Sequence, residues 1–463
     1  MKNQNSVSRR QFLMTSLATT AGAVALPTLI PSSVLGATAP SKVINVGQIG
    51  CGRIARDMDL PGILKHNIAR VVALCDVDSK RLADGKKLVE DYYAKRSGSS
   101  SAGEVKTYGD YRDLIKDPAV DAVAISTPDH WHAEPVVAAA LAGKDIYVQK
   151  PLTMTLEEGR IVSDIVRAKK RAFQIGSQQR STSQFRIACE LVRNGRIGTL
   201  HTVKIGLPVD PAGDEEPEMP VPPNLNYDMW LGCTPKVYYT EKRVHPQKDY
   251  SRPGYLRVEA HCLGMITGWG SHHVDIGHWG MGTELTGPIE AEGTAEFPKK
   301  GLWNVHGPYH IEMKYANGVK MIIDNNFPNG IRFEGSEGWI FVSRGGARAT
   351  ASDPATAYGK ALEASDPKIL NSKIGPNELH LPVSTDHHLN WLRSIQTREP
   401  AVTTPEEAHR STSACIIGWV AMKLGRRITW DPVKERFGDD AANALRSRPE
   451  RAPYGAVRLM QKA

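Results

Sequence analysis

The stretch SKVINVGQIGCGRIA, residues 41–55, runs from an apolar segment into a glycine-rich turn and predicts the fold of the first domain. Its first part, through Val46, is typical of a buried strand. The turn reads Gly50-x-Gly52-x-x-Ala55, which matches the dinucleotide-binding fingerprint. In that fingerprint the first glycine makes the turn, the second admits a pyrophosphate, and the third small residue packs the following helix on the strand. Because glycine-rich turns are common, the segments around the loop have to support this interpretation.

An acidic residue follows the loop at the distance that the fingerprint requires. The segment RVVALCDVDSKR, residues 70–81, is typical of a second buried strand, which ends at Asp76. A carboxylate at this position accepts hydrogen bonds from both ribose hydroxyls of NAD and would repel the 2′-phosphate of NADP. The sequence therefore predicts NAD as the cofactor, and the alternative is that Asp76 only caps the end of a strand.

Strands and helices alternate in the segments that follow. The apolar runs DAVAIST, DIYVQKP and RAFQIGS are separated by one helix that includes residues 136–141 and another that begins at Leu156. This alternation predicts a doubly wound parallel sheet, whose ligand lies at the carboxyl ends of the strands. The residues expected to contact the cofactor there are Gly50, Gly52, Arg53, Ile54, Asp76, Thr127, Pro128, His132, Lys150 and Gln178.

Length and composition describe a globular chain. With 463 residues it is long enough for about two domains. Lys and Arg exceed Asp and Glu by 8, but they are scattered along the chain, so we predict no nucleic-acid interface. The six cysteines contain no CxxC pair, and we expect isolated, buried thiols.

The N-terminal segment SRRQFLMTSLATTAGAVALP, residues 8–27, precedes the predicted fold. Arg9 and Arg10 stand before a weakly apolar run, and small residues at 37–39 are typical of a cleavage site. Polar residues and Pro27 interrupt the run, which argues against a stable membrane span. We expect a twin-arginine export signal over residues 1–39, and therefore a periplasmic protein that is exported folded with its cofactor.

The stretch GMITGWGSHHVDIGHW, residues 264–279, contains three histidines within seven positions. It allows three interpretations: a metal site, an acid–base centre, or polar residues on the outer face of a helix. His272 and His273 are adjacent, so on a helix they point about 100° apart, and neither has a histidine four residues later. We predict no metal, and a site that also recruits Glu259 or His261 is the minor alternative.

The motifs GQIGCGRIA, TPDHWHAEPVVAAALAGKDIYVQKPLT and GSHHVDIGHW, in this order, resemble the Gfo/Idh/MocA family of oxidoreductases from about Ser41 to the end of the chain. The resemblance implies an α/β protein with a Rossmann domain, assigned to residues 41–172. A C-terminal domain, residues 173–463, would be built on a large, mostly antiparallel open sheet. It also implies an NAD-dependent enzyme and a homo-oligomer, a dimer or a tetramer.

Residue patterns beyond position 200 support the second domain. HTVKIGL, residues 201–207, alternates with the period of a strand, and hairpin turns are indicated at residues 317–318 and 335–338. A helix over residues 404–425 is predicted to open with a capping box and to end near its final glycine. The proline-rich stretch at residues 208–224 is predicted to be a loop that covers the cleft.

The resemblance also implies a lysine from a Glu-Lys-Pro motif and an Asp-x-x-x-His pair beside the nicotinamide. Here the lysine is Lys150, and Gln149 replaces the glutamate. The histidine is His272, but the position four residues earlier is Gly268, so the aspartate is missing. Asp275 lies three residues after His272 on the same helical face and is the predicted replacement. We expect His272 to be the base and Lys150 to share in proton removal and in polarising the nascent carbonyl.

A polyhydroxylated ring is the expected substrate, because amides, a guanidinium group and aromatic faces suit a sugar or glycoside. Ordinary loop chemistry would explain each of these contacts singly. They are Gln179, Arg180, Tyr227, Trp230 and His273.

The predicted function is oxidation of a ring hydroxyl, such as that at C3, by hydride transfer to tightly held NAD. A redox-assisted glycoside hydrolase or lyase with no net redox change is the alternative. A non-catalytic dinucleotide-binding protein is a third interpretation, against which the retention of Lys150 and His272 argues.

Overall fold

The apolar run that precedes the glycine loop forms a central strand of a parallel sheet. In the computed structural model, which describes residues 43–97, 104–346 and 360–463, the strand order of this sheet is β3-β2-β1-β4-β5-β6. All of its strand pairs are parallel. This order is that of a doubly wound Rossmann sheet, and it confirms the predicted fold of the first domain. The strands are β1 (Ile44–Ile49), β2 (Ala69–Cys75), β3 (Lys106–Tyr108), β4 (Ala122–Ile125), β5 (Asp145–Val148) and β6 (Phe173–Ile175).

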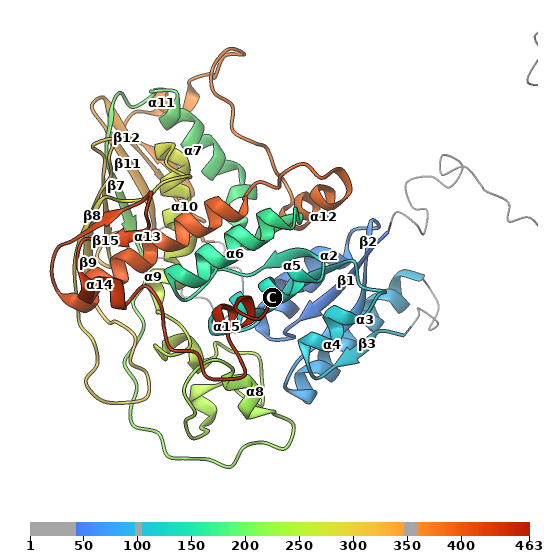
Figure 1. Cartoon of the computed structure of the whole chain (residues 1–463). Coiled ribbons are helices and arrows are strands. Elements are labelled where there is room, and N and C mark those ends of the chain that lie inside the picture. Colours follow the sequence, from blue (N-terminus) through green and yellow to red (C-terminus); the bar gives the residue numbers. More distant parts are fainter. Residues whose placement is uncertain (1–42, 98–103, 347–359) are drawn as a thin grey trace, which may run out of the picture. The chain divides into compact units, whose positions relative to one another are not determined.

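Helices connect the parallel strands and cover both faces of the sheet (Figure 1). Asp110 caps one of them by accepting from the backbone N–H of Arg112, and Thr155 caps another by accepting from that of Glu158. The connecting elements are the π-helical turn η2 (Ala55–Asp59), α2 (Leu60–Leu64), α3 (Ser79–Ser97), α4 (Tyr111–Lys116), the short helix η3 (Asp129–Trp131), α5 (Ala133–Leu141) and α6 (Leu156–Ala168).

The second sheet, within the same described ranges, has nine strands in the order β13-β12-β11-β7-β10-β9-β8-β14-β15. Only β7 and β10 pair in parallel among these neighbours, which confirms the predicted large, mostly antiparallel sheet. The strands are β7 (Leu200–Gly206), β8 (Glu290–Ala295), β9 (Tyr309–Lys314), β10 (Lys320–Asp324), β11 (Gly330–Gly335), β12 (Gly338–Val342), β13 (Leu362–Ala364), β14 (Ile428–Asp431) and β15 (Arg436–Phe437).

Both predicted hairpins are present in this sheet. β9 and β10 pair through Lys314 and Lys320 around the Asn317-Gly318 turn, and β11 and β12 pair through Gly335 and Gly338. Residues 207–222 contain neither helix nor strand, as expected of the proline-rich stretch.

Long helices pack on one face of the second sheet and form the largest hydrophobic core with it (Figure 1). The C-terminal one begins with the predicted capping box of Thr404 and Glu407 and ends at Gly425, which has a left-handed φ of 61°. The helices around this sheet are α7 (Ser183–Arg193), α9 (Met265–Gly268), α10 (Gly270–Met281), α13 (Pro405–Leu424) and α14 (Asp440–Ala444). The remaining helices are η4 (Gln178–Ser181), α8 (Tyr227–Leu231), η5 (Glu241–Arg243), η6 (Gly254–Arg257), α11 (Pro367–Asn371), α12 (His387–Thr397) and α15 (Ala456–Met460).

The parallel sheet extends beyond the boundary predicted at residue 172, because β6 pairs with β5. Two C-terminal helices also return to this part of the molecule. Trp391 of α12 is buried in one cluster with Val46 of β1, and Ala456 of α15 is buried in another with residues of α5. The division at residue 172 is therefore too early by one strand, and the end of the chain contributes to the first hydrophobic cores.

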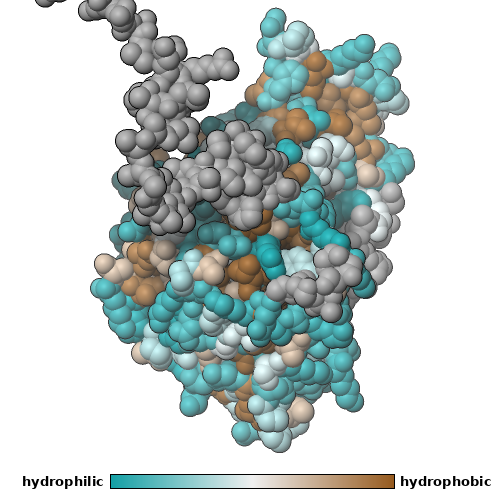
Figure 2. Space-filling model, turned by 90° about the vertical axis from the view of Figure 1, so that its right-hand side faces the viewer, coloured by the Kyte–Doolittle hydropathy of each residue, from teal (hydrophilic) through white to brown (hydrophobic). Residues whose placement is uncertain are grey.

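The six cysteines are all buried and form no disulfide, which confirms the prediction of isolated thiols. Within the described ranges, no helix combines the length and the hydrophobicity needed to cross a membrane. Figure 2 shows one face of the molecule, on which hydrophilic residues alternate with smaller hydrophobic groups. The predicted export signal at residues 1–39 lies outside the described residues.

Candidate active site

The glycine loop between β1 and η2 leaves its backbone accessible. Gly50 has a φ of +87°, and a Cβ atom there would lie 2.7 Å from the backbone oxygen of Ser126, so the turn requires glycine. A Cβ atom on Gly52 would meet nothing within 4 Å, and Gly52 lines a large cavity. The loop therefore offers a cradle at the point where the fingerprint places a pyrophosphate.

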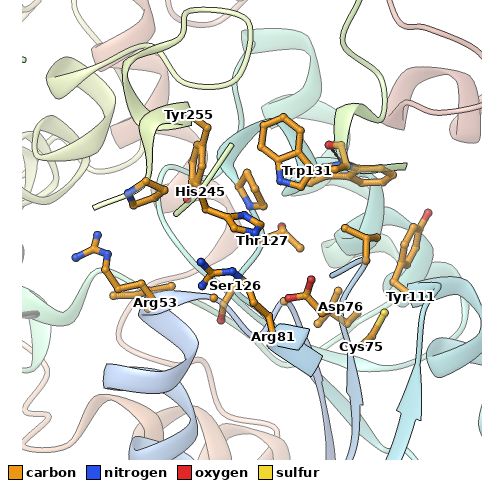
Figure 3. Close-up of a pocket in the computed structure, with 18 of the residues that line it drawn as sticks. Arg53, Cys75, Asp76, Arg81, Tyr111, Ser126, Thr127, Trp131, His245 and Tyr255 are labelled. Atoms are coloured by element: carbon orange, nitrogen blue, oxygen red, sulfur yellow. Dashed lines mark hydrogen bonds between the residues drawn. The ribbon is translucent and has the colours of Figure 1, made fainter. Parts of the chain in front are cut away.

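This first cavity has a volume of about 930 Å³, counting the space at its open mouth. Figure 3 shows Arg53, Asp76 and Arg81 on the side of the parallel sheet, with His245 and Tyr255 facing them from a later segment of the chain. The predicted cofactor contacts that line this cavity are Gly50, Gly52, Arg53, Ile54, Asp76, Thr127 and Pro128.

Asp76 fits the ribose of NAD. Its two carboxylate oxygens accept from the backbone N–H groups of Cys51 (2.7 Å) and Asp78 (2.8 Å), which leaves further lone pairs for two hydroxyl groups. Burial raises the pKa of Asp76, and the two backbone hydrogen bonds oppose that rise. The hydroxyl oxygen of Thr127 is buried and has no hydrogen-bond partner among the described residues. The cavity thus combines an open loop, an acceptor for the ribose and an unused hydroxyl, which suits a dinucleotide.

A second cavity of about 740 Å³, again with its open mouth counted, continues from the first. Arg53, Ile54, Thr127 and Tyr255 line both cavities, so the two join. The second cavity is also lined by the remaining predicted cofactor contacts, His132, Lys150 and Gln178, and by the predicted base His272.

Lys150 and His272 approach this second cavity from different parts of the fold. Lys150 follows β5, and its Nζ donates to the backbone oxygen of Gly268, 2.9 Å away. His272 lies in the first turn of α10. Burial lowers the pKa of His272 well below its ordinary value, and the nearby charges of Arg344 and Lys150 lower it further. The imidazole is therefore neutral at neutral pH and able to accept a proton.

The predicted roles of Asp275 and Arg180 are wrong. Arg180 donates from Nε and Nη2 to the two carboxylate oxygens of Asp275, each at 2.8 Å, and Ser411 donates to the same carboxylate. Both members of the pair are almost completely buried, and neither lines the second cavity. Asp275 therefore does not orient His272, because its charge is already balanced inside the core.

The other predicted substrate contacts also lie away from the second cavity. Tyr227 donates its hydroxyl proton to the backbone oxygen of Tyr238, and Trp230 lines the first cavity instead. His273 makes a 2.7 Å hydrogen bond from Nε2 to the side-chain oxygen of Asn329. None of Tyr227, Trp230 and His273 lines the second cavity.

Gln179 connects two groups of the site without lining the cavity. With its amide oriented to suit both neighbours, its nitrogen donates to the backbone oxygen of His272 (3.1 Å), and its oxygen accepts from Nε of Arg344 (3.2 Å). The predicted contact of Gln179 with substrate is therefore replaced by a structural role that holds His272 and Arg344 in place.

Several residues that line the second cavity lie in no recognisable sequence pattern. Asp129 lies in the motif that begins TPDHWH, but its place in the cavity depends on the short helix η3. The loop predicted to cover the cleft, residues 208–224, does not line either cavity, and residues 245–256 do so instead. The residues that sequence reasoning missed are Asp129, Arg252, Tyr255, Leu256 and Arg344.

The histidine-rich helix does not assemble a metal site. Among the described residues, no group of three or more His, Cys, Asp and Glu side chains is arranged to hold a metal ion. His278 instead makes a 2.7 Å hydrogen bond to the hydroxyl of Tyr315, and His261 packs edge-on against Trp230. Glu259, the other candidate ligand, forms a salt bridge with Lys423. The acid–base interpretation of His272 is the one that agrees with its place in the cavity.

Models of the two domains of one protein family match most of the chain. The model described as "Oxidoreductase family, NAD-binding Rossmann fold" matches residues 44–177. The model described as "Oxidoreductase family, C-terminal alpha/beta domain" matches residues 212–351 and 356–456. The chain belongs to the Gfo/Idh/MocA oxidoreductase family. It is an NAD-dependent oxidoreductase, and its first domain binds NAD.

Relatives in this family share part of the chain. The uncharacterized oxidoreductase YrbE of Bacillus subtilis is 26% identical over 320 residues, which cover 68% of this chain and 76% of that protein. Myo-inositol 2-dehydrogenase of Thermotoga maritima is 30% identical over 185 residues, 40% of this chain and 48% of that protein. A glycosyl hydrolase family 109 protein of Shewanella amazonensis is 32% identical over 169 residues, 33% of this chain and 35% of that protein. The chain thus matches less than half the length of the last two proteins.

A solved structure of levoglucosan dehydrogenase, in complex with NADH and levoglucosan, has the same fold. Its TM-score is 0.56 at 18% identity, and the match covers 83% of this chain and 99% of that one.

Within the Gfo/Idh/MocA family, this chain departs from the expected motif at Gln149 and supplies a carboxylate from elsewhere. Asp59, at the end of η2, is completely buried. It accepts from the hydroxyl of Ser126 (2.6 Å), from Nε2 of Gln149 (2.9 Å) and from Nε2 of His388 (3.0 Å). The carboxylate missing at position 149 is therefore replaced by one from the glycine-loop side, which holds the residue next to Lys150.

We predict that Asp59→Asn destabilises the protein, because an amide group cannot accept from all three donors. One buried donor left unsatisfied costs about 1–3 kcal/mol, which should appear in the free energy of unfolding measured by denaturant titration. Asp57→Asn is the matched control, since Asp57 lies in the same turn but is exposed. Equal stability of the two variants would contradict the proposed importance of Asp59.

Proposed function

We propose that this enzyme oxidises a ring hydroxyl, such as that at C3, of a sugar or glycoside, using tightly bound NAD. The proposal is based on one observation: Lys150 and His272 line the same cavity, and this cavity joins the cavity of the cofactor. We further propose that it works in the periplasm after twin-arginine export, and that it forms a homo-oligomer.

The chemistry requires a hydride acceptor and a group that takes the hydroxyl proton. NAD, when bound, supplies the acceptor for the hydride. His272 is neutral and takes the proton of the substrate hydroxyl. Lys150, whose Nζ also donates to the backbone oxygen of Gly268, lines the same cavity and polarises the nascent carbonyl. The residues that would hold NAD are those of the glycine loop together with Asp76 and Thr127.

Support for a ring substrate comes from the cavity and from the relatives. Trp269 and Tyr255 both line the second cavity, and aromatic faces suit the apolar faces of a sugar ring. The names of two similar proteins, myo-inositol 2-dehydrogenase and levoglucosan dehydrogenase, describe enzymes that act on polyhydroxylated rings. We assign the same class of substrate to this chain.

Tight cofactor binding is favoured by a segment that covers the first cavity, defined here as residues 222–255 and called the cover segment. His245 and Asn224 of this segment both bind the carboxylate of Asp78, at 2.9 and 2.8 Å. Arg81 donates to the backbone oxygen of Pro246, 2.7 Å away. These contacts begin two residues after Asp76, so the cover segment is fastened at the ribose end of the cavity. A cofactor enclosed in this way suits an enzyme that is exported folded.

A second candidate function is redox-assisted cleavage of a glycoside without net redox change. The likeness to a glycosyl hydrolase family 109 protein favours it, as does Gly268, which removes the carboxylate expected near His272. Nitrophenyl glycosides separate the two functions. A dehydrogenase converts bound NAD to NADH while the glycoside stays intact, whereas the second function releases nitrophenol with no accumulation of NADH.

We predict that Lys150→Met lowers kcat at least about 100-fold, because it removes a group that acts directly on the reacting oxygen. Bound NAD and the unfolding midpoint should stay unchanged. Lys169→Met is the control, because Lys169 is exposed at the end of α6. Turnover by Lys150→Met at the rate of the control would remove Lys150 from the mechanism.

The pH dependence of kcat/KM should reflect a neutral His272. Because burial, the cations Arg344 and Lys150, and the neighbouring His273 and His387 lower its pKa, the imidazole stays unprotonated as the pH falls through about 6.5. We therefore expect kcat/KM to change less than about twofold between pH 7.5 and 6, since the fall in kcat/KM that accompanies protonation of His272 occurs below this range. An acid limb centred at or above pH 6.5 that disappears in His272→Gln would contradict this assignment.

The cover segment should govern the release of NAD. Arg81→Met removes the donor to Pro246 and should increase the dissociation rate of NAD at least about tenfold, a change of about 1.4 kcal/mol in the barrier. The measurement is the amount of NAD per chain after dialysis, followed over time. Lys87→Met, on the exposed face of the same helix, is the control. Equal retention by both variants would show that the cover segment does not hold the cofactor.

A further inference from the structure

One acidic side chain lines the second cavity. Among the residues that the structure describes, Asp129 is the single carboxylate of that cavity. The residue is 5% exposed, and its Oδ2 is buried and has no hydrogen-bond partner within the described ranges. A carboxylate accepts hydrogen bonds but cannot donate them, and a buried acceptor without a donor is unfavourable. Asp129 therefore has an acceptor to offer to a ligand of the cavity.

The short helix η3 fixes Asp129 at the same edge of the parallel sheet as Lys150. η3 follows β4, and Lys150 follows β5, which pairs with β4, so both residues lie beyond the carboxyl ends of neighbouring strands. His132, at the end of η3, joins the two segments. Its Nδ1 lies 2.6 Å from the backbone oxygen of Pro151, and its Nε2 lies 3.0 Å from that of Thr127. The carboxylate is thus part of a rigid corner of the site.

The side chains around Asp129 leave its Oδ2 without a donor. Both ring nitrogens of His132 lie on backbone oxygens, so His132 has no donor left for the carboxylate. Cys262 and Tyr255 lie close to it: burial raises the pKa of each of these side chains, and the negative charge of Asp129 raises it further. A thiol is a weak donor, and in the described part of the chain no phenol or other group donates to Oδ2.

A hydroxyl group of the substrate is the donor that fits this acceptor. A polyhydroxylated ring presents several O–H donors, and a carboxylate can accept from two adjacent ones, as Asp76 is placed to do for the ribose. An ammonium group would also donate, but it would share the cavity with Lys150. Within the described ranges, no group of His, Cys, Asp and Glu side chains is arranged to hold a metal ion with Asp129.

We propose that Asp129 is a substrate-binding residue that accepts a hydrogen bond from the ring hydroxyl next to the one that is oxidised. This inference rests on the proposed sugar oxidation and names the class of substrate, a ring with two adjacent free hydroxyl groups. The base His272 lines the same cavity, and its buried Nδ1 has no hydrogen-bond partner among the described residues. One hydroxyl of the pair then faces His272 and Lys150, and the other faces Asp129.

The test compares methyl glycosides with their monodeoxy analogues on the holoenzyme. Methyl glucoside, galactoside and mannoside are each measured beside the analogues that lack one ring hydroxyl, with kcat/KM taken from the formation of NADH. The position of the carbonyl in the product is located by NMR. We expect kcat/KM of an oxidised parent glycoside to exceed that of the analogue deoxygenated at the adjacent carbon about tenfold or more, because a hydrogen bond to a charged group is lost.

Substitutions at position 129 show whether this preference depends on the carboxylate. Asp129→Ala should reduce the ratio of parent to adjacent-deoxy glycoside toward one, and Asp129→Asn, which keeps one acceptor oxygen, should give an intermediate ratio. The ratios for analogues deoxygenated at other carbons should stay as they are. Asp113→Ala is the matched control, because Asp113 is exposed on α4 and lines neither cavity.

Bound NAD separates substrate binding from cofactor binding. Asp129 lines the second cavity but not the first, so both variants should retain as much NAD per chain as the control. Loss of NAD from Asp129→Asn would assign the carboxylate to the cofactor and overturn the inference. A corresponding amino glycoside with a higher kcat/KM than its parent would overturn the choice of a hydroxyl as the ligand.

Calorimetric titration of the holoenzyme with the parent glycosides distinguishes failure of the inference from failure of the proposed function. Oxidation of a parent glycoside with equal parent-to-deoxy ratios in Asp129→Ala and Asp113→Ala would overturn the inference and leave the proposed function standing. Parents that bind more weakly to Asp129→Ala than to the control, but are never oxidised, would refute the proposed function and keep Asp129 as a residue that binds a ring hydroxyl. Failure of every parent glycoside to bind would overturn the inference itself.

Discussion

The buried carboxylate of Asp59 is the constraint on which the active site depends. It follows the glycine loop and accepts hydrogen bonds from the ends of two parallel strands, through Ser126 and Gln149, and from His388 of α12. A buried charge without these donors would cost several kcal/mol, so the four segments have to meet at this point. Thr127 and Lys150 are the next residues along the two strands. Their positions in the two cavities therefore follow from the way in which one carboxylate is satisfied.

Buried pairing of acids also explains the electrostatics of the second cavity. Asp275 is balanced by Arg180 in the core, and Asp59 is enclosed by donors, so neither carboxylate reaches the cavity. Burial lowers the pKa of His272, and the charges of Arg344 and Lys150 lower it further. The same arrangement keeps the imidazole of His272 neutral.

Two acids of one loop, Asp76 and Asp78, separated by Val77, have different roles around the cofactor cavity. Asp76 faces the first cavity, and burial raises its pKa while backbone N–H groups orient it. Asp78 turns to the cover segment, and its hydrogen bonds to His245 and Asn224 outweigh burial and lower its pKa. Asp76 therefore recognises the ribose, and Asp78, two residues later, attaches the cover segment. Because these residues are so close, a change in the backbone at one of them alters the position of the other.

The sequence by itself determined the Rossmann fold, the hairpins, the capped C-terminal helix and NAD as cofactor. These features depend on local patterns: the spacing of glycines, the alternation of apolar residues and the residues of turns. Lys150 and His272 were found in the same way, because each lies in a motif. Only the tertiary structure decided the partners of Asp275 and Arg180, the role of Asp59 and the place of Arg252 and Arg344. The physical reason is that the charge of a buried side chain is balanced by whichever group packs against it, and in this chain those groups lie up to hundreds of residues away in sequence, as His388 does from Asp59.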